Sequence, residues 1–339
     1  MTSRIAFVVY GSLEQVSGGY IYDRLVVEQL RGLGDEVTVL SLTPGQSDLP
    51  ELRGAGFDVV VGDELCFREL LPLFQRAEGG PRRVLLIHHL TAWEHPPGPE
   101  RDAVLALERA TVSAADVCVA TSHVTADRLF AERIARHAAV AEPGADRMPR
   151  PDTGGQEPSS ALLRLLFVGN ILRRKRVLEL CEAFASLTFA SAELVLVGSE
   201  LEPDYAAEVR AYVSQTGLGR RVRFLGPLPA EGVAEQLAQA DALVLPSALE
   251  GYGMVLSEAL WASVPVIAAR VGAAEQLVSR TGAGLLYEPD DRFALAATLS
   301  AFIGDGPLRA RLRRSAWEAA EVLPRWRDTA LCLRASWGG

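Results

Sequence analysis

The amino-acid sequence predicts an α/β protein built from two doubly wound, Rossmann-like domains. Its 339 residues exceed the usual size of a single hydrophobic core. Short apolar runs alternate with longer amphipathic stretches in both halves of the chain, which is the pattern of parallel strands covered by helices. Residues 148–160 (MPRPDTGGQEPSS) are rich in Pro, Gly and Ser and lack apolar periodicity, so we place a linker there. We therefore predict one domain at residues 1–150 and another at residues 161–321.

The first half contains apolar runs that we predict to be strands, at residues 5–10, 36–42, 57–61, 84–87 and 117–120. Helical spacing of apolar positions predicts helices at residues 20–33 and 100–114. The alternation restarts in the second half, with predicted strands at residues 165–168, 194–197, 222–225, 242–245 and 264–268. Residues 307–336 are predicted to be helical with a break at Pro324. We expect the C-terminal helix, at about residues 322–339, to pack back onto the first domain.

Composition and charge narrow the classes of partner. The formal net charge of -9 disfavours broad electrostatic binding to nucleic acid or to an anionic membrane, so we expect a small or neutral partner. The four cysteines are scattered and form no CxxC pair, which indicates reduced thiols rather than a metal site. Residues 5–10 follow no basic segment of an export signal, and no apolar run approaches the roughly 20 residues needed to span a bilayer. We expect a cytoplasmic protein without a transmembrane segment.

Two glutamates, Glu250 and Glu258, flank a predicted strand-to-helix turn. Glu250 follows the strand at residues 242–245, and Glu258 lies more than a turn inside the next helix if that helix begins near Gly253. Backbone amides at residues 251–255 then lack intrahelical partners and lie at the positive end of the helix dipole, which suits a diphosphate. The alternative is an ordinary glycine-flanked helix start with Glu258 in solvent. Spacing alone leaves both interpretations open.

The segment PSALEGYGMVLSEALWASVPVIA around these glutamates resembles the E-x7-E donor motif of retaining glycosyltransferases of family 4, and the following GAAEQL resembles its continuation. The resemblance covers essentially the whole chain and is strongest at residues 165–289. It implies the GT-B fold, in which two Rossmann-like domains face each other across a deep cleft. It also implies that Glu250 lies against the transferred sugar and that Glu258 binds the ribose hydroxyls. Backbone contacts to the sugar and diphosphate are implied for Gly251, Tyr252, Gly253, Met254 and Val255.

A basic turn, residues 169–175 (GNILRRK), follows the strand at residues 165–168. Its cations can neutralise the negative charge that develops on a leaving diphosphate, although a solvated basic loop is the alternative. In the family, this turn commonly carries an Arg directly after the Gly and a Lys five residues later. Lys175 matches that Lys, whereas Asn170 stands where the Arg is expected, so Arg173 or Arg174 would have to compensate. We assign Asn170, Arg174 and Lys175 to the donor site.

Gly18 and Gly19 separate the first predicted strand from its helix, and glycines there permit a tight turn near a phosphate. Because no complete GxGxxG follows, a dinucleotide-binding site is poorly supported. The resemblance implies that this glycine loop faces the donor diphosphate and the acceptor. It further places Gly198 at a strand-end turn and the backbone near Leu228 against the nucleotide base.

His88 and His89 end the strand at residues 84–87, where side chains of open α/β sheets often face a ligand. A zinc site would need further ligands, and only Glu94 and His95 are near, at unconvincing spacing. The resemblance implies that His88 contacts the donor sugar, with His89 as the second choice. We place Tyr20, His89 and Trp93 on the acceptor side, although packing in the core explains the aromatic residues equally well.

Together these features predict transfer of a hexose from a nucleotide diphosphate sugar, most simply a UDP-sugar, to a hydroxyl acceptor with retention of configuration. The catalytic groups would be His88, Lys175 and Glu250. No metal and no resident cofactor is expected, because the nucleotide sugar is a co-substrate and no DxD-like motif is evident. A small molecule or glycan is favoured over a lipid as acceptor, since no strong basic amphipathic helix is visible. The alternatives are a sugar phosphorylase or glycosyl-nucleotide hydrolase on the same scaffold, a catalytically silent nucleotide-sugar-binding protein and, more distantly, a Rossmann oxidoreductase.

Overall fold

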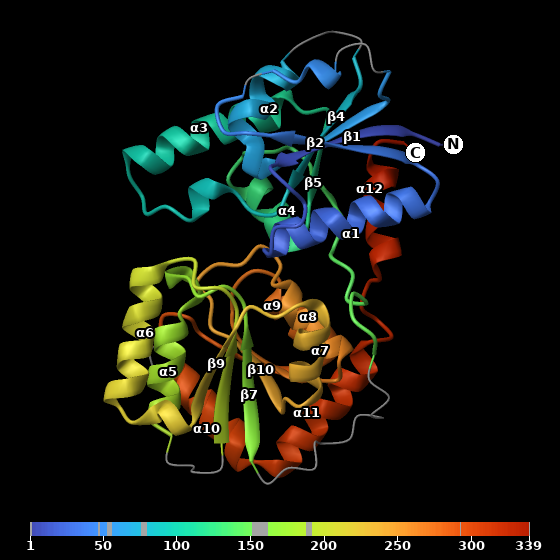
Figure 1. Cartoon of the computed structure of the whole chain (residues 1–339). Helices are drawn as coiled ribbons and strands as arrows, with labels where there is room; N and C mark the ends of the chain where they lie inside the picture. Colours follow the sequence, from blue (N-terminus) through green and yellow to red (C-terminus); the bar gives the residue numbers. More distant parts are fainter. Residues whose placement is uncertain are drawn as a thin grey trace. The chain divides into compact units, whose positions relative to one another are not determined.

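The computed structural model describes residues 2–46, 48–52, 56–75, 80–150, 162–187, 192–291 and 293–338. The chain forms two compact units, one of Met1–Gly144 with Pro324–Gly339 and the other of Ala145–Leu323 (Figure 1). Most of the predicted linker lies outside the described residues. Each unit is a parallel six-stranded sheet flanked by helices, which confirms the prediction of two doubly wound α/β domains.

The sheet of the first unit has the strand order β2-β1-β3-β4-β5-β6, with every neighbouring pair parallel. Its strands are β1 (Arg4–Tyr10), β2 (Glu36–Leu42), β3 (Val59–Asp63), β4 (Arg82–Ile87), β5 (Val117–Ala120) and β6 (Ala139–Val140). Its helices are α1 (Gly18–Gly32), α2 (Phe67–Phe74), α3 (Pro99–Ala114), α4 (His123–Ala131) and α12 (Trp326–Ser336), and short 3-10 turns occur at Pro50–Leu52, Glu64–Cys66 and Thr91–Trp93. Strands β1, β3 and β4 are largely buried apolar runs, as expected for a parallel sheet covered by helices on both faces.

Helix α12 belongs to the first unit, where it packs beside α1 (Figure 1). Thr329 donates its hydroxyl hydrogen to the carbonyl of Glu142 at 2.7 Å, and the ring of Trp326 packs edge-on against Tyr22 with centroids 5.5 Å apart. Gly144 makes this approach possible, since a Cβ atom there would come within 2.2 Å of the backbone nitrogen of Trp326. The crossover from the second unit therefore depends on a glycine.

Replacing this glycine by alanine should loosen the helix. We expect Gly144→Ala to cost about 2 kcal/mol, because the new methyl group can only be relieved by a shift of backbone. Gly32→Ala is the matched control, since a Cβ atom at Gly32 meets nothing within 4 Å. Urea denaturation followed by tryptophan fluorescence would measure both variants. Equal stability of the two would contradict the close packing of α12.

The sheet of the second unit has the strand order β12-β11-β10-β7-β8-β9, again with parallel neighbours. Its strands are β7 (Leu163–Val168), β8 (Ala192–Val197), β9 (Val222–Gly226), β10 (Ala242–Leu245), β11 (Val266–Ala269) and β12 (Gly284–Tyr287). Its helices are α5 (Val177–Ala185), α6 (Pro203–Gln215), α7 (Ala230–Ala238), α8 (Met254–Trp261), α9 (Ala274–Thr281), α10 (Ala294–Gly304) and α11 (Gly306–Ala319), with 3-10 turns at Arg173–Lys175 and Leu218–Arg220. One large apolar core runs through the layers between sheet and helices.

Residues 145–150, which we had assigned to the first domain, belong to the second unit. Their side chains explain this correction. Arg147 pairs with Glu258 on α8, and the indole N–H of Trp261 donates to the carbonyl of Met148 at 2.8 Å. Arg150 pairs with Glu321 at 2.8 Å. These contacts join residues more than 100 positions apart, so local composition did not indicate them.

Candidate functional site

The second unit reverses its strand order between β7 and β10, which are hydrogen-bonded neighbours. In open parallel sheets, ligands bind beyond the carboxyl ends of the strands at such a reversal. Two loops leave the sheet there, residues 169–176 after β7 and residues 246–253 after β10. The predicted basic turn and the first predicted glutamate therefore lie at the same edge of the same sheet.

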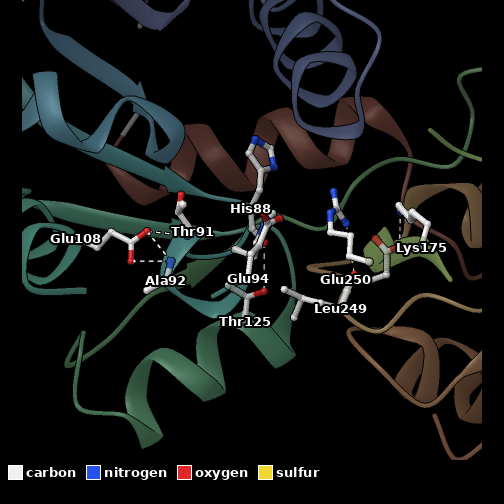
Figure 2. A network of polar contacts seen from close by, with 11 residues as sticks. His88, Thr91, Ala92, Glu94, Glu108, Thr125, Lys175, Leu249 and Glu250 are labelled. Atoms are coloured by element: carbon white, nitrogen blue, oxygen red, sulfur yellow. Dashed lines mark hydrogen bonds and ion pairs between the residues drawn. The ribbon is translucent and has the colours of Figure 1, made fainter. Parts of the chain in front are cut away.

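Lys175 and Glu250 form an ion pair that joins these two loops (Figure 2). Their side chains are only 14% and 10% exposed. The backbone adds a second connection, because the amide of Ala248 donates to the carbonyl of Arg174 at 2.8 Å. The guanidinium of Arg174 in turn lies 3.5 Å from the carbonyl oxygen of Leu249. Lys175 is also the only lysine in the chain, so all other permanently cationic side chains are arginines.

The ion pair keeps Glu250 charged. Burial alone would raise the pKa of this carboxyl, but the charges of Lys175 and Arg174, together with hydrogen bonds from Lys175 and Ser247, lower the pKa below its ordinary value. Glu250 is thus a carboxylate at neutral pH and cannot serve as a proton donor. It is suited to accept hydrogen bonds from hydroxyl groups.

The second glutamate of the motif is also paired. Glu258 lies inside α8 and is 3% exposed, which excludes the alternative of a solvated helix residue. Its two carboxylate oxygens face Arg147, with Nε 2.8 Å from Oε1 and Nη2 2.9 Å from Oε2. Nη2 donates a hydrogen bond to Oε2, and the Nε–Oε1 contact adds charge attraction, so the carboxylate is held by its cationic partner. Sequence reasoning missed Arg147 because it lies directly before the segment assigned to the linker, far from Glu258 in the sequence.

The amino end of α8 follows the loop that carries Glu250. Gly253 precedes the helix with φ +86, a left-handed conformation that favours glycine. Met254 and Val255 form the half-buried first turn, where amides lack intrahelical acceptors. Tyr252 is only 5% exposed, so a ligand could reach its backbone more readily than its ring. Gly253, Met254 and Val255 accordingly place backbone amides at the same strand edge as Lys175.

Two glycines let neighbouring loops approach the site. A Cβ atom at Gly198, where φ is +149, would lie 1.9 Å from the carbonyl oxygen of Gly169, so Gly198 packs directly against the peptide that precedes Asn170. A Cβ atom at Gly272, where φ is +54, would lie 2.5 Å from the carbonyl oxygen of Glu250. We predicted Gly198 but not Gly272. The signal for Gly272 was its place in the sequence directly before the AAEQL run that resembles the family.

The two arginines considered as substitutes at the basic turn differ in placement. Arg173 pairs with Glu208 at 3.0 Å and stacks over the ring of Tyr205, so it is engaged with α6. Arg174 contributes to the charge around Glu250. Of the two, Arg174 is therefore the one placed to support Lys175. The predicted base contact, Leu228, lies between β9 and α7 and is half-buried.

The buried ion pair is open to a direct test. Lys175→Met should destabilise the second unit by about 3 kcal/mol, because it leaves the Glu250 carboxylate buried without its partner. The double variant Lys175→Met/Glu250→Gln should recover much of that loss, since no charge then remains to be desolvated. Urea denaturation of both single variants and the double variant measures the coupling. If the loss of stability in the double variant equalled the sum of the losses in the two single variants, the ion pair would be contradicted.

In the first unit, His88 lies directly after β4 (Figure 2). Gly19, at the start of α1, is close to its ring, since a Cβ atom there would lie 3.4 Å from the imidazole Cδ2. The imidazole Nε2 is 3.3 Å from the carboxylate of Asp23, and the ring packs edge-on against Tyr22 with centroids 5.1 Å apart. Burial lowers the pKa of His88, with a partial opposite effect from the charge of Asp63, so its ring is neutral at neutral pH. We did not predict either aspartate.

The residues predicted for the acceptor side have specific surroundings. His89 lies 2.7 Å from Glu94. Trp93 donates its indole N–H to Glu132 at 3.0 Å, and the guanidinium of Arg128 stacks on its ring. The indole N–H and one face of the ring are therefore already occupied. Tyr20 is 9% exposed. Of the three, His89 is the most available to a ligand.

A buried glutamate orders the turn that carries these residues. The amides of Thr91 and Ala92 donate to Glu108 at 2.6 Å and 3.3 Å (Figure 2). Burial nevertheless raises the pKa of Glu108 to about 7, since the amide hydrogen bonds offset it only in part. Glu108 lies in α3, so these hydrogen bonds attach the Thr91–Trp93 turn to that helix.

The comparisons with known proteins agree with this architecture. The family described as glycosyl transferases group 1 matches residues 158–318. A D-inositol 3-phosphate glycosyltransferase from Catenulispora acidiphila is 31% identical over 293 residues, which span 79% of this chain and 69% of the relative. An N-acetyl-alpha-D-glucosaminyl L-malate synthase from Bacillus anthracis is 32% identical over 156 residues, 46% of this chain and 40% of the relative.

Solved structures show the same fold. Sucrose-phosphate synthase from Thermosynechococcus elongatus superposes with a TM-score of 0.82 at 22% identity, over 98% of each chain. The Anabaena protein HepE, solved with UDP and glucose, gives a TM-score of 0.79 at 19% identity, also over 98% of each chain. The chain belongs to the group 1 glycosyl transferases and has the GT-B fold, which confirms the resemblance noted in its sequence. It is a glycosyltransferase that uses a nucleotide sugar. Among the residues that the structure describes, no helix has the length and apolar composition needed to cross a bilayer.

Proposed function

We propose that this glycosyltransferase transfers a hexose from a UDP-sugar to a small hydroxyl-bearing acceptor, with retention of configuration and without a metal ion. The observation that carries the proposal is the buried ion pair of Lys175 and Glu250 at the strand-order reversal of the second unit. It puts a cation for a diphosphate and a carboxylate for sugar hydroxyls side by side. A cytoplasmic location and the absence of a resident cofactor stay predictions.

The proposed chemistry is a front-face displacement. The bond between the sugar C1 and the diphosphate oxygen breaks, and its electron pair goes to that oxygen. Lys175, Arg174 and the amides at the start of α8 stabilise the developing negative charge. The acceptor oxygen attacks the same face of an oxocarbenium-like sugar and passes its proton to the leaving phosphate oxygen. In this scheme the protein positions groups and balances charge, and no side chain forms a covalent bond.

The two glutamates have separate proposed roles. Glu250, held ionised by Lys175, accepts hydrogen bonds from hydroxyls of the transferred sugar. Glu258, held by Arg147, presents its carboxylate to the ribose hydroxyls. Each glutamate is paired with a cation, which offsets the cost of burying its carboxylate. His88 is proposed to contact the donor sugar as a neutral imidazole.

The glutamates predict distinct kinetic effects. Glu250→Gln should lower kcat by about 100-fold or more, because the amide cannot match the carboxylate next to positive charge in the transition state. Glu258→Gln should act mainly on the KM for the donor. Glu318→Gln, on the exposed face of α11, is the control and should leave both parameters unchanged. Steady-state assays of nucleotide release measure these values. An unchanged kcat in Glu250→Gln would contradict the assigned role.

The acceptor proposal rests on a cavity in the first unit. This cavity, of about 730 Å³, lies at the carboxyl ends of β1 to β4. Its lining includes the charged or titratable residues Tyr10, Arg68, Glu69, His95 and Glu100. Arg68 stacks on Phe67 and forms no ion pair with any described residue. The names of the two relatives given above mention D-inositol 3-phosphate and L-malate, which are both small, anionic and hydroxylated. An acceptor of that chemical kind fits a cavity with an available guanidinium.

The activity is tested by incubating the protein with UDP-sugars and each of these two acceptors. We expect release of UDP, a product with the anomeric configuration of the donor by proton NMR, and full activity in EDTA. Inversion of configuration would overturn the proposal of a retaining mechanism. Loss of activity in EDTA that a divalent cation restores would overturn the proposal of metal independence. Release of sugar phosphate that depends on inorganic phosphate would indicate a phosphorylase. Tight donor binding without turnover would indicate a silent binding protein.

A further inference from the structure

Two buried aspartates lie beneath His88 in the first unit. Asp23 belongs to α1 and Asp63 ends β3, and both are 0% exposed. One ligand atom from each of Asp23, Asp63 and His88 lies within 4.8 Å of the other two. The three residues are brought together at the strand-order reversal of this sheet, where β1 and β3 are neighbours.

The hydrogen bonds of these carboxyl groups leave one oxygen of each without a partner. Asp23 Oδ1 lies 3.3 Å from His88 Nε2, and Asp63 Oδ1 accepts from the amide of Leu65 at 3.0 Å. The remaining oxygens, Asp23 Oδ2 and Asp63 Oδ2, are buried and have no donor if both groups are ionised. Buried polar atoms are rarely left without a hydrogen bond, so these two oxygens require a donor.

Among the described residues, no lysine or arginine compensates the two carboxyl groups. The side chains that act on their pKa values are those of each other and of His88, which acts on Asp63. The charges of the aspartates in turn raise the pKa values of Tyr20, Tyr22, Glu64 and Cys66. Burial raises the pKa of both aspartates to about 7, and the charge of Asp23 contributes to the rise at Asp63. By the same cause, the pKa of the buried Glu64 lies well above its ordinary value.

We propose that Asp23 and Asp63 share a single proton and together fix the orientation and tautomer of His88. In this arrangement, Asp63 Oδ2–H donates to Asp23 Oδ2, and His88 Nε2–H donates to Asp23 Oδ1. One proton thus supplies the donor that both unpartnered oxygens lack. The imidazole Nδ1 is left as the acceptor for a substrate hydroxyl. Asp23 and Asp63 are positioning residues, and their effect on catalysis rests on the role of His88 in the proposed function.

The same three side chains would also suit a divalent cation, which is the competing account. A cation would need both carboxylates ionised and would take the place of the shared proton. The two accounts differ in the protonation of Asp63 at neutral pH. They also differ in the effect of Asp63→Asn, because an amide N–H can replace the shared proton but removes a negatively charged metal ligand.

Carbon NMR of protein labelled at aspartate Cγ measures the protonation of the carboxyl groups in the unliganded protein. Nitrogen NMR of labelled histidine measures the tautomer of His88. We expect Asp63 to be protonated at pH 6, and His88 to carry its proton on Nε2 at pH 6 and pH 7. Asp63→Asn should retain this tautomer, whereas Asp63→Leu should lose it and give a mixture. Two ionised carboxyls at pH 6, a proton on Nδ1, or one bound metal ion per chain that shifts the aspartate signals would each overturn the proposal.

The pH dependence of kcat/KM distinguishes a positioning role of the two aspartates from a purely structural one. Above pH 7, loss of the shared proton should lower kcat/KM of the wild type, so its value at pH 9 should fall at least threefold below that at pH 7. Asp63→Asn should show less than half of this fall, and Asp63→Leu should lose at least tenfold of kcat/KM at pH 7. Identical profiles for the wild type and Asp63→Asn would contradict the shared proton. If transferase activity is absent altogether, the proposed function fails while the NMR titration still decides the state of the aspartates.

The stability profile follows from the same pKa directions. Because both folded-state pKa values lie above the unfolded value, the folded state holds more protons than the unfolded state between about pH 4 and pH 7. The urea midpoint of the wild type should therefore fall as pH rises through that range. The fall should be shallower in Asp63→Asn, which has one raised carboxyl fewer. Parallel midpoint curves for the two proteins would count against a proton held at Asp63.

Discussion

The ion pair between Lys175 and Glu250 is the interaction on which the second unit's site depends. It ties the loop after β7 to the loop after β10 at the one place in the sheet where the strand order reverses. Burial makes the pair mutually dependent, since neither charge is stable there without the other. In the proposed function, a substrate diphosphate that approaches Lys175 competes with Glu250 for the ammonium group, and the released carboxylate accepts hydrogen bonds from sugar hydroxyls. The pair holds the unliganded site ready without leaving a charge exposed.

The two units treat buried carboxylates in opposite ways. In the second unit each glutamate of the motif has a cationic partner, Lys175 or Arg147, and Glu250 in particular stays ionised. In the first unit, Asp23 and Asp63 face other acids and a neutral imidazole, so burial raises their pKa values. The second unit thus presents fixed negative charge, whereas the first presents groups that exchange protons near neutral pH. That contrast suits one unit to hold a charged donor and the other to orient hydroxyl groups.

The sequence was sufficient for the fold because buried parallel strands are continuous apolar runs, and these alternate visibly with helices. It indicated Lys175 and Glu250 as candidates because each follows such a run, and the structure pairs the two. It did not indicate the partner of Glu258 or the two aspartates near His88. Arg147 lies 111 residues before Glu258. Asp23 and Asp63 are isolated acids in the sequence, and only the fold brings them close to each other and to His88. Two strands were also missed. Strand β6 has only two residues, which carry no periodic pattern, and the short strand β12 begins with a glycine.

The central claim is that Lys175 binds the donor diphosphate, and its uniqueness allows a direct measurement. Growth of the expression host with lysine labelled by carbon-13 and nitrogen-15 places the isotopes at this one residue. Titration of the labelled protein with a UDP-sugar should shift the side-chain signals of Lys175 in a saturable way, with the same midpoint as calorimetric binding. Signals that stay unchanged while calorimetry reports binding would show that the donor lies elsewhere, and would contradict the account.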